Sequence, residues 1–204
     1  MAIVQARMTS TRFPGKVLAK FPDGKPVIHH VVTRIAQAGI VPVVAMPTGK
    51  GQNALSEWCQ NNHIQWIAPE CKEDDVLTRY FLAATYFNAK AILRVTCDCP
   101  AVSPSLIKEL VKGFKEANGA YYFGLDVPHT IPDGLDAEIF SYRHLRRAFA
   151  EANSLYDREH VTPWMKRKEV YIRIGTGFNF RGIKFSVDEP EDMGRAWEWM
   201  TKIG

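Results

Sequence analysis

The sequence predicts an α/β domain of three layers, in which helices cover both faces of a mixed, mostly parallel β-sheet. Two observations lead to this class. Short apolar stretches alternate with amphipathic ones along the chain, as strand and helix do in repeated β–α units. The apolar stretches are also continuous, which is typical of strands buried on both faces. A chain of 204 residues suits one such core, so we expect a single domain over residues 1–204.

The composition excludes several classes of protein. Apolar residues make up 46% of the chain and charged residues 24%, so global disorder is not expected. A net charge of +4 suits an anionic small substrate and is too low to indicate nucleic acid. Apolar runs are too short for a membrane span or a signal peptide, and we expect neither. Four cysteines without zinc-finger spacing indicate reduced thiols in a cytoplasmic enzyme.

Strands and helices are predicted in alternation over the first half of the chain. Apolar residues at helical spacing end at Gly39, a C-cap, and an acidic segment with Asp74 or Asp75 as cap precedes the third helix. The strand at 91–96 is the clearest, because it is rich in β-branched residues. The expected strands cover 3–4, 40–46, 64–67 and 91–96, with a short extended piece at 17–19, and the expected helices cover 28–38, 54–60 and 75–88.

The second half of the chain is less regular. A Pro-Asp-Gly turn at 132–134 lies in a loop predicted over residues 128–140. Asp188 is expected to end the last strand, and Pro190 to lie in the first turn of the helix that follows. The expected helices are 106–117, 142–152 and 193–200, and the expected strands are 120–123, 170–174 and 183–188.

A cluster of cations follows the first predicted strand. Guanidinium groups bind phosphate oxygens through paired hydrogen bonds, and lysine adds a point charge. The alternative is a solvated basic turn, which composition alone favours. The glycine spacing and the final Lys-Ser/Thr pair of a P-loop are missing. The cluster lies where parallel sheets bind ligands, and it consists of Arg7, Ser10, Thr11, Arg12, Gly15 and Lys16.

Two aspartates come directly after predicted strands at this same edge of the sheet. Asp98 follows the strand at 91–96, and Asp188 ends the strand before the last helix. A carboxylate just past a buried parallel strand projects into the ligand crevice. Each also has a structural interpretation, Asp98 as a turn-capping residue before Pro100 and Asp188 as the N-cap of the last helix.

The order of residues in the opening loop resembles the start of the CMP-sugar synthetases. It is most similar to the spore-coat-polysaccharide-type cytidylyltransferases, which are related to the acylneuraminate and KDO cytidylyltransferases. The resemblance implies a nucleotide-diphospho-sugar-transferase-like fold and a loop that wraps the triphosphate of CTP. The segment is Gln5-Ala6-Arg7-Met8-Thr9-Ser10-Thr11-Arg12-Phe13-Pro14-Gly15-Lys16, and the nucleotide contacts implied are Gln5, Ala6, Arg7, Ser10, Thr11, Arg12 and Lys16.

Further segments extend the resemblance. The stretch from Asp75 to Arg79 is similar to one near the nucleotide, which implies a nucleotide contact for Arg79. Asp98 stands in a Thr-Gly-Asp-Cys-Pro-like segment whose aspartate binds Mg²⁺ in the family, although Cys97 replaces the glycine here. The family pattern makes Asp188 the second Mg²⁺ ligand and Mg²⁺ the expected cofactor.

The acceptor side of the site is implied by two later segments. The loop after Pro132 resembles one that binds sugar hydroxyls in the family, and the segment around His160 resembles another motif. Residues of this second segment either contact an acidic sugar or brace the partner of a homodimer, which the family usually forms. The implied acceptor residues are Asp133, Gly134, Asp136, Glu138, Arg158 and His160.

The implied reaction is Mg²⁺-dependent transfer of CMP from CTP to an acidic or amino sugar, for surface polysaccharide or glycan biosynthesis. Three alternatives remain open: a nucleotidyltransferase with another NTP, a glycosyltransferase of related fold, and a non-catalytic nucleotide-binding assembly subunit. A glycosyltransferase would show Asp-x-Asp where this chain has Cys97-Asp98-Cys99. The expected catalytic set is Arg7, Arg12, Lys16, Asp98 and Asp188.

Overall fold

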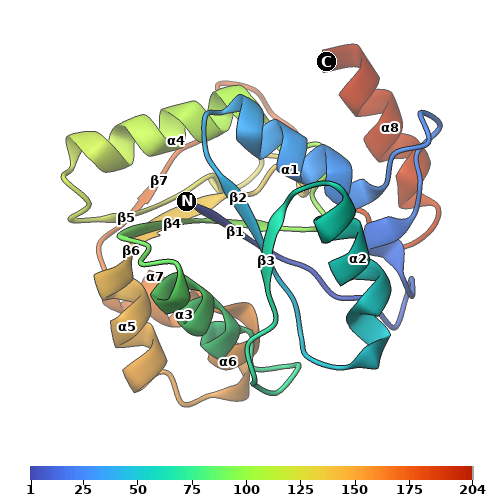
Figure 1. Ribbon diagram of the computed structural model, residues 1–204. Helices are drawn as coiled ribbons and strands as arrows, with labels where there is room; N and C mark the ends of the chain where they lie inside the picture. Colours follow the sequence, from blue (N-terminus) through green and yellow to red (C-terminus); the bar gives the residue numbers. More distant parts are fainter. Residues whose placement is uncertain (204) are drawn as a thin grey trace.

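The computed structural model, which describes residues 1–203, contains one sheet between two layers of helices (Figure 1). The strands are β1 (Ala2–Gln5), β2 (Pro42–Ala45), β3 (Gln65–Ile67), β4 (Ala91–Thr96), β5 (Tyr122–Gly124), β6 (Glu138–Ser141) and β7 (Tyr171–Arg173). They form a seven-stranded sheet in the order β3-β2-β1-β4-β6-β5-β7. Among the described strands, β6 runs antiparallel to both of its neighbours and the other pairs are parallel. The predicted mixed, mostly parallel sheet is therefore confirmed.

The helices divide between the two faces of the sheet. They are η1 (Lys16–Leu18), α1 (Val27–Gln37), η2 (Lys50–Gln52), α2 (Asn53–Asn61), α3 (Val76–Tyr86), α4 (Pro104–Glu116), α5 (Tyr142–Glu151), α6 (Leu155–His160), α7 (Pro163–Lys168) and α8 (Asp192–Ile203). Helices α1, α2, α4 and α8 pack on one face, and α3, α5, α6 and α7 on the other (Figure 1). Strand β1 serves both cores, because Ala2 and Val4 face one layer and Ile3 the other. Within the described residues, no helix has the length and apolar character needed to cross a membrane.

The strand order creates a crevice between β1 and β4. The chain runs outward from β1 to β2 and β3, and then returns to place β4 on the other side of β1. Parallel sheets bind ligands at such a point, beyond the carboxyl ends of the two strands. Gln5 is in register with Thr96, so the segments that follow β1 and β4 start side by side. This topology brings the opening loop and Asp98 to one place.

Local signals in the sequence agree with the structure at several helix ends. The Asp75 carboxylate caps α3 by accepting a hydrogen bond of 3.1 Å from the Thr78 backbone N–H. Gly39 follows α1 with a φ of 79°, the left-handed conformation typical of a glycine after a helix. Strand β4 has the predicted bounds, residues 91–96.

Three predictions of secondary structure were wrong. Residues 17 and 18 belong to the 3-10 helix η1, and only Ala19 of the predicted piece is extended. Gly15 turns the chain there, and Leu18 N–H donates to the Gly15 carbonyl at 2.9 Å. Strand β6 begins inside the stretch predicted as a loop over residues 128–140 and ends at Ser141. Residues 183–188 are not a strand, since their ladder contact is one isolated bridge between Asp133 and Lys184.

Strand β6 carries a buried carboxylate in its first residue. Glu138 is 5% exposed, and its Oε2 lies 2.8 Å from Nη1 of Arg94 while its Oε1 lies 2.9 Å from Nζ of Lys166. Tyr122 and Thr162 donate to the same carboxylate. Burial opposes the charge, but Arg94 and Lys166 outweigh it and hold the pKa of Glu138 below its ordinary value. These contacts fix β6 to β4, and they leave Glu138 no exposed face for a sugar.

Replacing Glu138 with Gln should lower the free energy of unfolding by about 3 kcal/mol, the scale for breaking a buried ion pair. Urea unfolding measures this, and Glu198→Gln is the control because Glu198 pairs with Lys202 at the surface. A depressed pKa adds stability above the unfolded value of about 4.3 that is lost as pH falls through the folded pKa. The gap between wild type and Glu138→Gln should therefore narrow in acid, and equal losses in both variants would contradict the assignment.

Candidate functional site

A cavity of about 290 Å³ opens beyond the carboxyl ends of β1 and β4. The residue types on its wall are cations, hydroxyls and carboxylates, as a phosphorylated ligand with a metal ion requires. The opening loop, Asp98, Asp188 and His160 of the predicted site all contribute to it. The lining consists of Gln5, Ala6, Arg7, Ser10, Thr11, Arg12, Lys16, Val17, Thr96, Cys97, Asp98, His160 and Asp188.

The opening loop closes on itself before η1. Gly15 has a φ of 72°, and its N–H donates to the Met8 carbonyl at 2.8 Å. Met8 N–H in turn donates to Oε1 of Gln52 at 2.9 Å, which ties the loop to the start of α2. The backbone is therefore fixed at both ends of the loop, and its long cationic side chains extend from this turn into the cavity.

Lys16 joins the two predicted carboxylates. Its Nζ lies 3.1 Å from Oδ2 of Asp98 and 3.2 Å from Oδ1 of Asp188, and it donates to the Val187 carbonyl at 2.8 Å. Nη2 of Arg12 lies 2.9 Å from the same Oδ1 of Asp188. Burial opposes ionisation of Asp188, but the ammonium groups of Lys184 and Lys16 lower its pKa below the ordinary value. Asp188 is thus a fixed negative charge on the cavity wall.

The segment that carries Asp188 crosses over the strand ends on backbone hydrogen bonds. Val187 N–H donates to the Asp98 carbonyl at 2.7 Å, and Phe185 N–H donates to the Asp133 carbonyl at 2.6 Å. Ser186 Oγ donates to the Asp133 carboxylate at 3.0 Å. Gly134 is required beside it, because its φ is 98° and a Cβ there would meet the backbone of Ser186. The predicted acceptor residues Asp133 and Gly134 therefore seat the segment that delivers Asp188.

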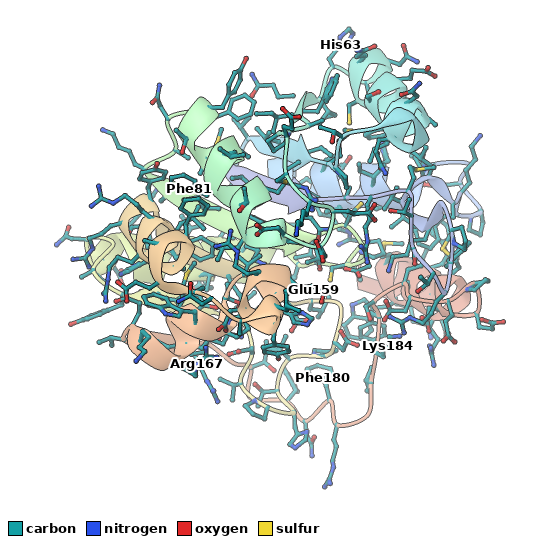
Figure 2. The ribbon with its side chains drawn as sticks, turned by 90° about the horizontal axis from the view of Figure 1, so that it is seen from below. His63, Phe81, Glu159, Arg167, Phe180 and Lys184 are labelled. Atoms are coloured by element: carbon teal, nitrogen blue, oxygen red, sulfur yellow. The ribbon has the colours of Figure 1, made fainter. Side chains whose placement is uncertain are left out.

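Two residues that hold Asp188 were missed by sequence reasoning. Nζ of Lys184 lies 2.9 Å from Oδ2 of Asp188 and 3.1 Å from Oδ2 of Asp192, and Figure 2 shows Lys184 next to α8. The same Oδ2 of Asp192 accepts hydrogen bonds from the backbone N–H groups of Asp188 and Glu189. The Asp192 carboxylate thus holds the turn that leads from Asp188 into α8. The only sequence signal for this ion pair is the spacing of four residues between Lys184 and Asp188. That spacing brings two side chains together only when the backbone between them turns, and the sequence does not show the turn.

The remaining predicted residues lie at the border of the cavity or in the interior. Arg158 donates two hydrogen bonds to Asp75, of 3.0 and 2.8 Å, and so links α6 to the start of α3. Arg79 is fully buried, and its Nη2 donates to the carbonyls of Lys72 and Glu73. Glu73 then pairs with Arg7 at 3.3 Å, so Arg79 reaches the cavity wall through this loop.

Asp136 lies in the same loop as Asp133 and Gly134. Its Oδ2 accepts a hydrogen bond of 3.0 Å from Gly134 N–H, and burial raises its pKa to about 6. His160, at the end of α6, reaches the cavity that Asp98 lines. Asp133 and Asp136 are not among the residues that line the cavity.

The carboxylate pair fits a hard divalent cation. Within residues 1–203 no cluster of three or more His, Cys, Asp or Glu side chains is arranged to hold a metal ion. Asp98 and Asp188 supply two oxygen ligands, and Mg²⁺ is commonly bound by one or two carboxylates with phosphate oxygens and water. Burial raises the pKa values of the neighbouring Cys97 and Cys99 thiols well above the ordinary value for cysteine. The two thiols therefore stay protonated, and protonated thiols are poor metal ligands.

Two solved structures that share this fold are named as a cytidylyltransferase and as a CMP-sugar synthetase. A cytidylyltransferase from Leptospira borgpetersenii serovar Hardjo-bovis superposes with a TM-score of 0.85 at 25% identity, over 94% of this chain and 82% of that chain. CMP:2-keto-3-deoxy-manno-octonic acid synthetase, solved with CTP, has a TM-score of 0.73 at 16% identity and shares the fold over 100% of this chain and 98% of that chain. Together with a cytidylyltransferase family match over residues 1–195, this likeness makes the protein an enzyme of the nucleotidyltransferase class.

Within this class, the chain belongs to the cytidylyltransferase family, whose sequence profile matches residues 1–195. It is 24% identical to spore coat polysaccharide biosynthesis protein SpsF of Bacillus subtilis, over 93% of this chain and 81% of that protein. It is 29% identical to an uncharacterized protein of Methanocaldococcus jannaschii, over 94% of this chain and 79% of that protein. A 3-deoxy-manno-octulosonate cytidylyltransferase of Geobacter metallireducens is 33% identical over 54% of this chain, a match that spans only 42% of that protein. The resemblance to cytidylyltransferases that the opening loop indicated is therefore confirmed.

Replacing Gly134 with Ala should separate Asp188 from Asp98. Both the positive φ of Gly134 and the contact with the Ser186 backbone oppose a Cβ. The backbone of residues 134 and 186 must therefore shift, and the free energy of unfolding should fall by about 3 kcal/mol or more. Gly24→Ala is the matched control, because Gly24 has a φ of 78° but open space around it, and it should cost about 1 kcal/mol.

Urea unfolding and the rate of pyrophosphate release measure the two effects of these variants. Gly134→Ala should lose activity even at temperatures where it remains folded. Equal stability and equal activity in the two variants would show that the contact between Gly134 and Ser186 does not control the position of Asp188.

Proposed function

We propose that the protein transfers CMP from CTP to an acidic or amino sugar with Mg²⁺, releasing pyrophosphate, for surface polysaccharide or glycan biosynthesis. The observation that carries this proposal is that Asp98 and Asp188 meet at one ammonium in a cavity lined by Arg7 and Arg12. Family membership supports the use of CTP, and two relatives are named for spore coat polysaccharide biosynthesis and for 3-deoxy-manno-octulosonate cytidylyl transfer.

The opening loop would bind the triphosphate. CTP carries about four negative charges at neutral pH, and they must be neutralised before a nucleophile reaches the α-phosphorus. Arg7 and Arg12 are 39% and 58% exposed in their side chains, so both can turn from their carboxylate partners to phosphate oxygens. Ser10 and Thr11 add hydroxyl donors, while Gln5 and Ala6 place the end of β1 beside the nucleotide. Arg79 supports this side of the site through the loop that holds Glu73.

Asp98 and Asp188 would hold Mg²⁺. When bound, such an ion neutralises charge on the phosphates and lowers the pKa of a hydroxyl close to it. The protein's own contribution is to keep Asp188 ionised and to orient both carboxylates. Lys184 and the backbone bond from Val187 to Asp98 serve that purpose.

The acceptor would lie on the side of Asp133, Asp136 and His160. Carboxylates accept hydrogen bonds from sugar hydroxyls or from an ammonium group. In the proposed step the acceptor hydroxyl oxygen forms a bond to the α-phosphorus and loses its proton to water. The bond from the α-phosphorus to the bridging oxygen breaks, and pyrophosphate leaves on the opposite side. Positioning of the two reactants accounts for much of the rate, because it converts encounter into a reaction within one complex.

We also propose that the protein forms a homodimer through α6. Leu155 is 83% exposed and Tyr156 61%, and both precede His160 on this helix. A pair of exposed apolar side chains beside a ligand cavity is suited to a second copy of the chain. Light scattering should give twice the mass of one chain for wild type, and the mass of one chain for Leu155→Lys. A single-chain mass for wild type at micromolar concentration would contradict the dimer.

Nucleotide selectivity tests the proposed function most directly. With Mg²⁺ present, CTP should raise the unfolding temperature more than ATP, GTP or UTP, because a ligand bound to the folded state stabilises it. Pyrophosphate release from CTP, measured with a panel of acidic, amino and neutral sugars, should depend on an acidic or amino sugar. Equal shifts with all four nucleotides would favour another nucleotidyltransferase, and no shift would favour a non-catalytic subunit.

Replacing Asp98 with Asn should reduce turnover by about two orders of magnitude or more and leave the fold intact, the scale for losing a preorganised electrostatic group. Pyrophosphate release at saturating CTP measures turnover, and circular dichroism checks the fold. Glu109→Gln, an exposed carboxylate on α4, is the control and should be as active as wild type. Near-normal turnover of Asp98→Asn would overturn the role given to this carboxylate.

A further inference from the structure

Lys16 occupies a position between three oxygen atoms that suits a small cation. Its Nζ is 2.8 Å from the Val187 carbonyl, 3.1 Å from Asp98 and 3.2 Å from Asp188. The side chain is only 12% exposed, so these contacts replace most of its hydration. Two of the three oxygens are those that the proposed function gives to Mg²⁺.

An ammonium group and a divalent cation cannot share this position. The two ions would lie within a few ångströms of each other, where like charges repel strongly in a partly buried site. Lys16 also belongs to the loop that is proposed to bind the triphosphate. In the nucleotide-free protein it therefore contacts the carboxylates, whereas with nucleotide bound it has a second set of oxygens to contact.

We propose that Lys16 closes the divalent-cation site of the nucleotide-free protein, and that the phosphates of the nucleotide open it by drawing the ammonium away. The inference rests on the proposed function and adds an order of events to it. The cation enters with the nucleotide or after it. By linkage, each ligand strengthens binding of the other by the same factor.

The Lys16 backbone stays in place during this exchange, and the side chain alone moves. Lys16 N–H donates to the Phe13 carbonyl, and its own carbonyl accepts from Ala19 N–H, both at 3.1 Å. The four-carbon stem of lysine carries a compact charge that can turn about several bonds. Gly15 and the fixed turn around it hold the start of this stem close to both sets of oxygens.

The two aspartates differ in what they lose when Lys16 leaves. Asp188 keeps Lys184 at 2.9 Å even when Arg12 also turns to the phosphates. Asp98 has Lys16 as its ion-pair partner, and among the side chains that the structure describes no other cation lies within 4.0 Å of it. Departure of Lys16 leaves Asp98 uncompensated in a partly buried place, which is unfavourable unless another cation replaces the ammonium. The exchange therefore couples nucleotide binding to cation binding.

Equilibrium binding of Mn²⁺ without nucleotide tests the proposal. Free Mn²⁺ is measured by electron paramagnetic resonance during titration of wild type, Lys16→Met and Lys16→Gln. Both variants remove the charge and retain much of the stem, and the second guards against a folding defect in the first. Each should bind Mn²⁺ at least about 10-fold more tightly than wild type, a change of about 1.4 kcal/mol. Lys20→Met, an exposed lysine outside the cluster, is the matched control and should equal wild type.

Binding of Mn²⁺ by the folded Lys16 variants that is no tighter than wild type would overturn the inference. The unfolding temperature gives a second measurement, because Mn²⁺ alone should raise it in the variants and not in wild type. Failure of the proposed function has a different signature. Equal thermal shifts with all four nucleotides would reject CTP selectivity, whereas the titration without nucleotide would still report on Lys16.

Discussion

Asp98 and Asp188 lie on separate segments, and the ammonium of Lys16 holds them together. Two carboxylates in a partly buried cavity repel each other unless cations lie between or beside them. Lys16 lies between the two, and Arg12 and Lys184 lie beside Asp188. The cavity at the carboxyl ends of β1 and β4 depends on this pairing of carboxylates with cations. The opening loop supplies the cations, the turn before α8 supplies Asp188, and the end of β4 supplies Asp98.

The surrounding structure keeps this cluster in place with backbone hydrogen bonds and a second set of buried charges. Residues 185–187 are bonded to the backbone of Asp133 and Asp98, so the segment is fixed although it belongs to no ladder of the sheet. Behind it, Glu138 joins the antiparallel strand β6 to Arg94 of β4. The two networks serve different purposes. The one around Glu138 is closed and structural, while the one around Lys16 faces a cavity and can exchange its partners.

Residues implied by family resemblance divide in the same way. The opening loop, Asp98, Asp188 and His160 line the cavity. Gly134 and Glu138, expected on the acceptor side, hold the backbone and the sheet on which the site is built. A motif in this family therefore combines groups that face the ligand with groups that support them. Sequence similarity alone does not distinguish the two, because both are needed for one geometry.

The sequence by itself determined the α/β class, most helices, strand β4 and the chemistry of the opening loop. These follow from local patterns, namely apolar periodicity, capping residues and the types of side chain within a few positions. Only the tertiary structure decided that residues 183–188 cross the strand ends without joining the sheet, that β6 runs antiparallel, and that Lys184 and Asp192 hold Asp188. The reason is that each of these depends on contacts between segments far apart in the chain. Such contacts also place the opening loop opposite the two carboxylates. Arg7, Arg12 and Lys16 are a basic turn in the sequence and become a candidate phosphate and metal site once the fold places two carboxylates opposite them.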